Sequence, residues 1–140
     1  MSHFENPTME EIRALLQRVR TIAVVGLSPK RNRPSHAVAE SLQCFGYRII
    51  PVRPAVESVL GEKAYAELRD LPEKPDLVDV FRAPEHVGPI VDECIALGIK
   101  AIWLQDGVIN EAAALKAQQA GLTVIMDRCI YRDFMRLMQP

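Results

Sequence analysis

Short apolar runs alternate with amphipathic or polar segments along almost the whole chain. The five clearest runs are 22–25, 47–52, 77–81, 99–104 and 122–126. Runs of this length that are rich in Val and Ile are typical of strands buried on both faces of a parallel sheet. The pattern therefore predicts five short buried strands.

Helical signals fill most of the segments between these runs. Thr8 and Glu11 have the spacing of a capping box, and the apolar residues that follow predict a helix from about Met9 to Arg20. Further helices are expected over 36–45, where Gly46 supplies the stop, from Pro84 to Gly98, from Asn110 to Gly121, and over 131–139. The segment 53–76 contains Gly61, Pro72 and Pro75 and is expected to be irregular.

Strands that alternate with helices predict an α/β fold. Parallel strands need crossover connections, and right-handed crossovers place helices on both faces of the sheet. We therefore expect a Rossmann-like domain with a five-stranded parallel sheet of order 3-2-1-4-5, numbered along the chain. Its ligand crevice would lie beyond the carboxyl ends of the strands, where the order reverses. A chain of 140 residues fits a single such domain over 1–140.

Composition and charge narrow the function further. The formal net charge is −1 and the pI is near 6.3, so no overall basic field indicates nucleic acid as a partner. No apolar run is long enough to span a membrane, and the first residues lack a signal peptide pattern, so a cytoplasmic location is expected. The three cysteines and three histidines have no metal-ligand spacing, so no metal site is expected.

The loop from Gly26 to Ser35 is the strongest candidate for a binding site. A glycine directly after a buried strand lets a ligand approach the backbone, and Ser35 after Pro34 is expected to be the N-cap of the next helix. Lys30, Arg31 and Arg33 add positive charge, so phosphate binding is favoured over a merely solvated turn. The loop matches neither G-x-G-x-x-G nor G-x-x-x-x-G-K-[ST].

Polar residues also follow the other predicted strands. The residues just after the strands of a parallel sheet share one edge, which here collects Arg53, Arg82, Gln105 and Arg128. A structural alternative remains open, in which Arg82 and Arg128 pair with Asp127 or Asp106.

Several blocks of sequence together resemble a known family. They are Val25-Gly26-Leu27-Ser28, Arg33-Pro34-Ser35, Gly46-Tyr47, Pro51-Val52 with Pro54, Leu60-Gly61, Val80-Phe81-Arg82, Trp103-Leu104-Gln105, Asn110-Glu111-Ala112 and Met126-Asp127-Arg128-Cys129. Over about residues 8 to 135 the chain resembles the small stand-alone CoA-binding proteins. These are similar to the CoA-binding N-terminal domain of succinyl-CoA synthetase and of NDP-forming acyl-CoA synthetases.

The resemblance implies coenzyme A as the ligand and a role for each matched block. It implies that Gly26, Leu27 and Ser28 lie under the phosphates of CoA, with Arg33 and Ser35 as partners of the phosphates. It also implies that Pro51, Val52 and Pro54 lie along the adenosine and that Val80, Phe81 and Arg82 form the opposite wall. Gln105 and Gly107 would then meet the pantetheine end. The family commonly has asparagine where this chain has Arg53. Arg53 therefore either adds a contact to the 3′-phosphate or fills part of the adenosine pocket.

Catalytic candidates are few. His36 is more readily explained as an exposed helix residue, Cys129 as a buried structural cysteine, and Asp106 and Asp127 as carboxylates that hold arginines or cap loops. No complete set of nucleophile, base and oxyanion donors can be assembled. The sequence thus favours a module that binds CoA or an acyl-CoA without turnover, as a carrier, a sensor or a partner module.

Two other classes of function stay open. One is an enzyme that uses the same pocket, either as an acyl-CoA ligase or transferase component or as an NAD(P)-linked oxidoreductase. The missing glycines disfavour the oxidoreductase, although Arg53 would suit the 2′-phosphate of NADP. The other is a thiol redox partner of CoA through Cys129. A protein partner or a homodimer is compatible with each of these functions.

Overall fold

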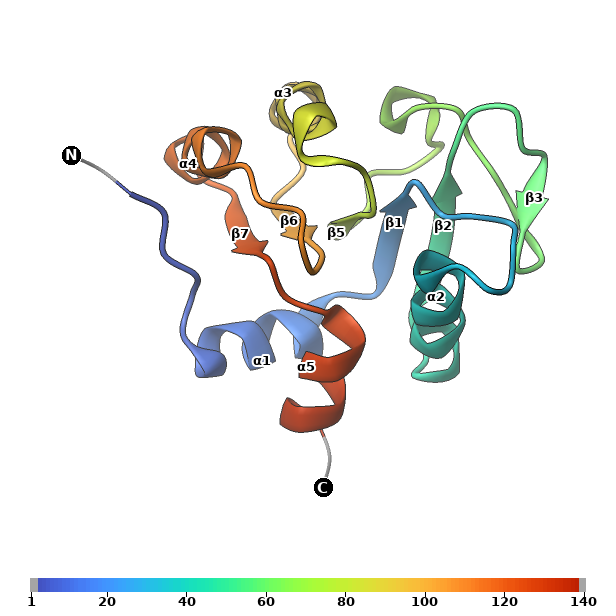
Figure 1. The fold of residues 1–140 in the computed structure, drawn as a ribbon, viewed down its shortest axis with the longest axis horizontal. Coiled ribbons are helices and arrows are strands. Elements are labelled where there is room, and N and C mark those ends of the chain that lie inside the picture. The colour runs from blue at the N-terminus through green and yellow to red at the C-terminus, as the bar shows by residue number, and fades with distance from the viewer. Residues whose placement is uncertain (1–2, 139–140) are drawn as a thin grey trace.

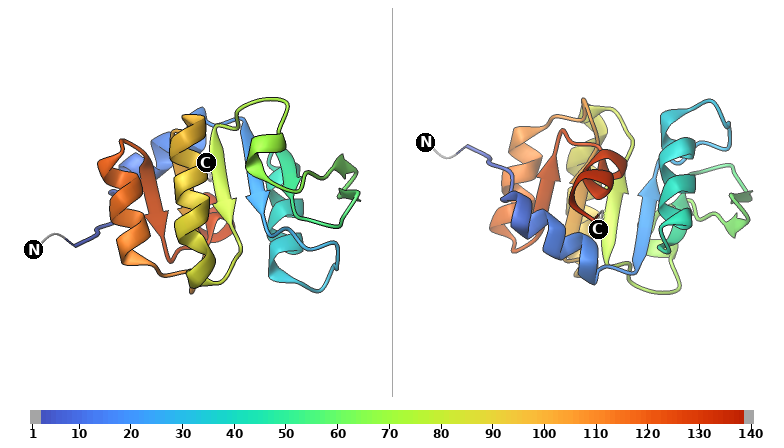
Figure 2. Two further views of the ribbon diagram at one scale, coloured as in Figure 1. Left: turned by 90° about the horizontal axis from the view of Figure 1, so that it is seen from above. Right: turned by 90° about the horizontal axis from the view of Figure 1, so that it is seen from below.

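The structure, a computed structural model that describes residues 3–138, has three layers. Its central sheet contains β1 (Thr21–Val25), β2 (Arg48–Val52), β5 (Leu77–Val80), β6 (Ala101–Leu104) and β7 (Thr123–Met126), all parallel. One face is covered by α1 (Met9–Arg18), α2 (Pro34–Cys44) and α5 (Ile130–Leu137), and the other by α3 (Val87–Leu97) and α4 (Glu111–Gln119) (Figures 1 and 2). The expected α/β class, with a five-stranded parallel sheet and helices on both faces, is confirmed.

The strand order is β2-β1-β5-β6-β7. The expected order 3-2-1-4-5 placed β2 between β1 and β5, whereas in the structure β5 pairs directly with β1 and β2 lies at the edge. Asp76, directly before β5, ties β5 to β1, because its Oδ2 accepts hydrogen bonds from the backbone N–H groups of Arg20 and Thr21. Pro51 in β2 lacks an N–H group, which suits an edge strand. The strands that follow β1 in the sequence therefore lie on both sides of it, β2 on one side and β5 on the other.

The ends of the helices follow local chemistry. The capping box of Thr8 and Glu11 at the start of α1 is confirmed, and the side chain of Asn110 caps α4 as expected. Gly98 ends α3 in the left-handed conformation, with φ 73°. A short 3-10 helix, η2 (Pro84–His86), precedes α3. Of the expected 131–139 helix, Gln139 lies outside the described residues.

The start of α2 differs from the expectation. Arg33, not Ser35, is the N-cap residue, and Pro34 opens the helix because its missing N–H costs nothing there. Ser35 lies in the first turn, where its Oγ accepts a hydrogen bond from the backbone N–H of Ser28 at 3.0 Å. The serine therefore fixes the loop after β1 instead of capping the helix.

The segment 53–76 is less irregular than expected. It contains the small antiparallel pair β3 (Ser58–Val59) and β4 (Glu62–Lys63) and the 3-10 helix η1 (Leu68–Asp70). Tyr65 then lies beside the open edge of β2, where its N–H donates to Pro51 and its carbonyl accepts from the N–H of Arg53. This pairing covers the sheet edge and fixes the backbone of Arg53 at the end of β2.

The core has one apolar layer on each face of the sheet. Trp103 is fully buried in the layer under α1, α2 and α5, and its indole N–H donates to the backbone carbonyl of Arg128 at 2.8 Å. Among the described residues, no helix has both the length and the apolar character needed to cross a membrane.

Candidate functional site

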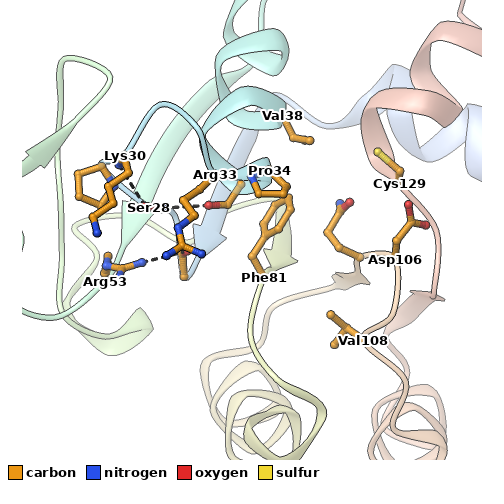
Figure 3. Close-up of a pocket in the computed structure, with 14 residues that line it drawn as sticks. Ser28, Lys30, Arg33, Pro34, Val38, Arg53, Phe81, Asp106, Val108 and Cys129 are labelled. Carbon is orange, nitrogen blue, oxygen red and sulfur yellow. Dashed lines mark hydrogen bonds between the residues drawn. The ribbon is translucent and has the colours of Figure 1, made fainter.

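A cleft of about 720 Å³ opens at the carboxyl ends of β1, β5 and β6, beside the start of α2 (Figure 3). Seven of the expected site residues line it: Gly26, Ser28, Arg33, Ser35, Arg53, Phe81 and Gln105. The other five do not: Leu27 and Val52 are buried beneath it, Arg82 is half-buried, and Pro54 and Gly107 are exposed. The cleft therefore draws together segments that are far apart in the sequence.

Gly26 forms the turn at the base of the cleft. Its φ is 86°, and its N–H donates to the carbonyl oxygen of Val52 at 2.9 Å. A Cβ at this position would lie 2.4 Å from the carbonyl oxygen of Phe81, well inside contact distance. Gly26 is thus required both by its backbone conformation and by the close approach of β5.

Hydrogen bonds hold Ser28 in place on the loop. Its N–H donates to Ser35 Oγ, its Oγ accepts from the N–H of Lys30 at 3.1 Å, and its carbonyl oxygen lies 3.0 Å from His36 Nδ1. His36 was expected to be an exposed helix residue, but it is only 6% exposed because its ring packs under the loop. Its contact with Ser28 gives His36 a structural role in shaping the cleft.

Positive charge gathers at one end of the cleft. Figure 3 shows Lys30, Arg33 and Arg53 there, and Arg53 Nη1 donates to the carbonyl oxygen of Gly26 at 3.4 Å. Within residues 3–138, no carboxylate forms an ion pair with any of the three. Three cations without acidic partners can attract an anion such as phosphate.

Apolar side chains line the middle of the cleft. Phe81 lies between the cationic end and the opposite wall, with Val38 and Val108 on either side (Figure 3). The two valines were not among the expected site residues. Their signal was positional, since Val38 comes one helical turn after Ser35 and Val108 comes three residues after Gln105.

A buried carboxyl group lies under the floor of the cleft. Asp79 is fully buried in β5, and its Oδ1 accepts a hydrogen bond from Gln105 Nε2 at 2.6 Å. Burial raises the pKa of Asp79 to about 7, although the hydrogen bond from Gln105 opposes that shift. Sequence reasoning missed Asp79. Its only signal was a single carboxylate inside the apolar run of Leu77–Val80.

Paired charges lie beside the far end of the cleft, around a separate hollow that is lined by Asp127, Arg128, Arg132 and Asp133. Asp106 forms an ion pair with Arg132, and Asp127 Oδ1 accepts from the N–H of Gly107 at 2.7 Å. Arg128 donates two hydrogen bonds to Asp133, at 2.7 and 2.8 Å. Asp106 and Asp127 thus have the ordinary structural roles that the sequence favoured, whereas Arg128 pairs with a residue of α5 and not with Asp106 or Asp127.

Cys129 lies on the wall at this far end (Figure 3). It was expected to be buried, but it is half-buried and reaches the cleft surface. Over the part of the chain that the structure describes, no group of three His, Cys, Asp or Glu side chains could hold a metal ion.

A family model and several known proteins match this chain. A family model described as "CoA binding domain" matches residues 20–134. The protein YneT of Bacillus subtilis (strain 168) is 41% identical over 126 residues, which cover 90% of this chain and 93% of YneT. A hypothetical protein from Pyrococcus horikoshii OT3 superposes with a TM-score of 0.92 at 37% identity, covering 99% of this chain and all of that one.

A longer relative matches this chain over only part of its own length. "Acetate--CoA ligase [ADP-forming] I" of Archaeoglobus fulgidus (strain ATCC 49558 / DSM 4304 / JCM 9628 / NBRC 100126 / VC-16) is 22% identical over 121 residues. The match covers 79% of this chain but only 18% of the ligase. From the extent of the family match and the likeness to YneT, this chain belongs to the CoA binding domain family.

Proposed function

We propose that this protein binds CoA or an acyl-CoA in the cleft, with the phosphates at its cationic end. The observation that carries the proposal is the group of Lys30, Arg33 and Arg53, which face the cleft without carboxylate partners among residues 3–138. CoA carries a diphosphate and a 3′-phosphate, and this arrangement of cations suits several phosphates close together.

The remaining lining suits the rest of such a ligand. Gly26 would let the diphosphate approach the backbone, and Ser35 lies in the first turn of α2, whose positive end stabilises negative charge. The pantetheine arm would run over Phe81, between Val38 and Val108, toward Gln105. A largely apolar channel with a charged end fits a ligand that is itself charged at one end.

We assign the protein a binding role, as a carrier, a sensor or a partner module. The ligase relative is several times longer than the matched region, so its activity is not carried over to this chain. The alternatives remain an acyl-CoA ligase or transferase component and an NADP-linked enzyme, the latter because Arg53 stands at the end of β2. The cytoplasmic location and a protein or homodimer partner stay predictions.

Calorimetric titration with CoA, dephospho-CoA, NAD and NADP tests the proposal. Binding of CoA that weakens when the 3′-phosphate is absent supports it, because only the cationic end distinguishes the two ligands. Equal affinity for all four ligands, or no binding of CoA, would overturn it. Tighter binding of NADP than of CoA would favour the oxidoreductase alternative.

A further inference from the structure

The buried pair of Asp79 and Gln105 is not explained by the cationic end of the cleft. Asp79 faces the same side of β5 as Phe81 two residues later, so it lies one layer below the cleft floor. Its Oδ2 has no hydrogen-bond partner among the described residues. A carboxyl group kept in such a place is costly, and within residues 3–138 Asp79 forms no ion pair.

The pair fixes which way the amide of Gln105 points. Nε2 donates to Asp79 Oδ1 at 2.6 Å, which leaves Oε1 as the free end of the amide. Oε1 has no hydrogen-bond partner among residues 3–138, and it is not fully enclosed by them. Because Gln105 lines the cleft, Oε1 remains accessible on the cleft side. Gln105 therefore presents an acceptor to a ligand.

The charge of Asp79 fixes this orientation. When the carboxyl is ionised, both of its oxygens can only accept, so Nε2 must face it. In that state the amide nitrogen of Gln105 points to Asp79 and leaves the amide oxygen for the cleft.

We propose that Asp79 is a positioning residue that holds Gln105 Oε1 toward the cleft, so that the site selects ligands with an N–H donor at this point. This inference rests on the proposed function, since in CoA the matching donor is an amide N–H of the pantetheine arm. A ligand that placed a carbonyl or carboxylate oxygen there would face another acceptor and lose affinity.

Two substitutions and two ligands test the proposal. Adenosine 3′,5′-bisphosphate keeps the nucleotide end of CoA and lacks the pantetheine arm. Gln105→Ala removes the acceptor and is expected to lower CoA affinity about tenfold. Asp79→Asn allows the amide of Gln105 to turn and is expected to lower CoA affinity about threefold. The affinity for the bisphosphate should stay the same in both variants.

The double variant shows whether Asp79 acts through Gln105. In the Gln105→Ala background, Asp79→Asn should cause no further loss of CoA affinity, because the amide that it orients is gone. Asp79→Leu replaces the asparagine variant if that variant does not fold. Tyr47→Phe is the matched control, since it removes a partly buried 2.6 Å hydrogen bond to the carbonyl oxygen of Leu16 on the same face of the sheet, far from the cleft.

The outcomes separate this inference from the proposed function. A loss of CoA affinity in the Asp79 and Gln105 variants alone, with bisphosphate binding unchanged, supports the positioning role. Unchanged CoA affinity in these variants, additive losses in the double variant, or equal losses for both ligands would overturn the positioning role only. Failure of the unsubstituted protein to bind CoA would overturn the proposed function and this inference with it.

Discussion

The cationic end of the cleft and the hollow beside its far end use the same kind of side chain in opposite ways. At the cationic end Lys30, Arg33 and Arg53 have no carboxylate partner within residues 3–138, whereas in the neighbouring hollow Arg128 and Arg132 each hold an aspartate. A paired arginine has its charge satisfied and fixes the elements that it joins. An unpaired one keeps its charge available, so the unpaired end is the end that attracts an anionic ligand.

A second contrast concerns two buried carboxyl groups. Asp133 is 3% exposed and is paired with Arg128, whereas Asp79 is fully buried and none of the described cations pairs with it. Burial without a cation explains why the pKa of Asp79 is raised to about 7.

Asp79→Asn should remove a pH dependence of stability. In the folded protein the pKa of Asp79 is raised from 3.8 to about 7, so the folded state holds the proton more tightly than the unfolded state. The stability of the unsubstituted protein relative to the variant should therefore be greatest near pH 4 and fall as the pH rises to about 7. The full change would be on the order of 4 kcal/mol. Urea unfolding of both proteins between pH 5 and 8 measures most of it, and a constant difference across that range would contradict the prediction.

Arg128→Ala should destabilise the fold at the hollow beside the far end of the cleft. The substitution leaves the buried carboxylate of Asp133 without its cation, which typically costs about 3 kcal/mol. Arg132→Ala is the matched control, because it also removes a paired arginine, but both side chains of that pair are at least half exposed. Its expected cost is much smaller, because solvent screens an exposed pair. Equal losses in denaturant unfolding would show that burial of the partner does not decide the strength of these pairs.

Gly26→Ala should lower the stability of the fold more than Gly107→Ala does. Both glycines have positive φ, 86° and 79°, so both variants carry a backbone cost of about 1 kcal/mol. Only at Gly26 would the new Cβ also meet a backbone oxygen, that of Phe81 at 2.4 Å, whereas Gly107 has open space around it. We expect about 2 kcal/mol more destabilisation at Gly26, measured by thermal or denaturant unfolding. Similar losses in the two variants would mean that β1 and β5 separate easily.

Local sequence signals predicted the elements well, because strands and helix caps depend on neighbouring residues. The capping box of Thr8 and Glu11 and the cap at Asn110 are examples. The neighbours of β2 were not predictable in this way, since every strand is apolar and the contacts of Asp76 that tie β5 to β1 span more than 50 positions. Pro51 was the one local hint of an edge strand.

The cationic half of the site was likewise visible in the sequence, because charge density and a glycine turn lie within one loop. The pair of Asp79 and Gln105 was not, because its meaning depends on two side chains from adjacent strands meeting inside the protein. The packing of His36 under Ser28 was missed for the same reason: the loop folds back over the helix that follows it.

Arg53→Ala gives the smallest expected effect and bears most directly on the unpaired end. The substitution removes a cation that lines the cleft and has no acidic partner among residues 3–138, so stability should change little while CoA affinity falls about tenfold. Arg132→Ala makes the same change in net charge outside the cleft, in the neighbouring hollow, and should leave CoA affinity as it was. Arg53→Lys should restore part of the affinity, because lysine keeps the charge but loses the planar fork.

Titration with CoA and dephospho-CoA at two salt concentrations then separates the two roles left open for Arg53. If it contacts the 3′-phosphate, its removal abolishes the preference for CoA and reduces the salt dependence. If it instead fills part of the adenosine pocket, its removal leaves that preference intact and the affinity equal or higher.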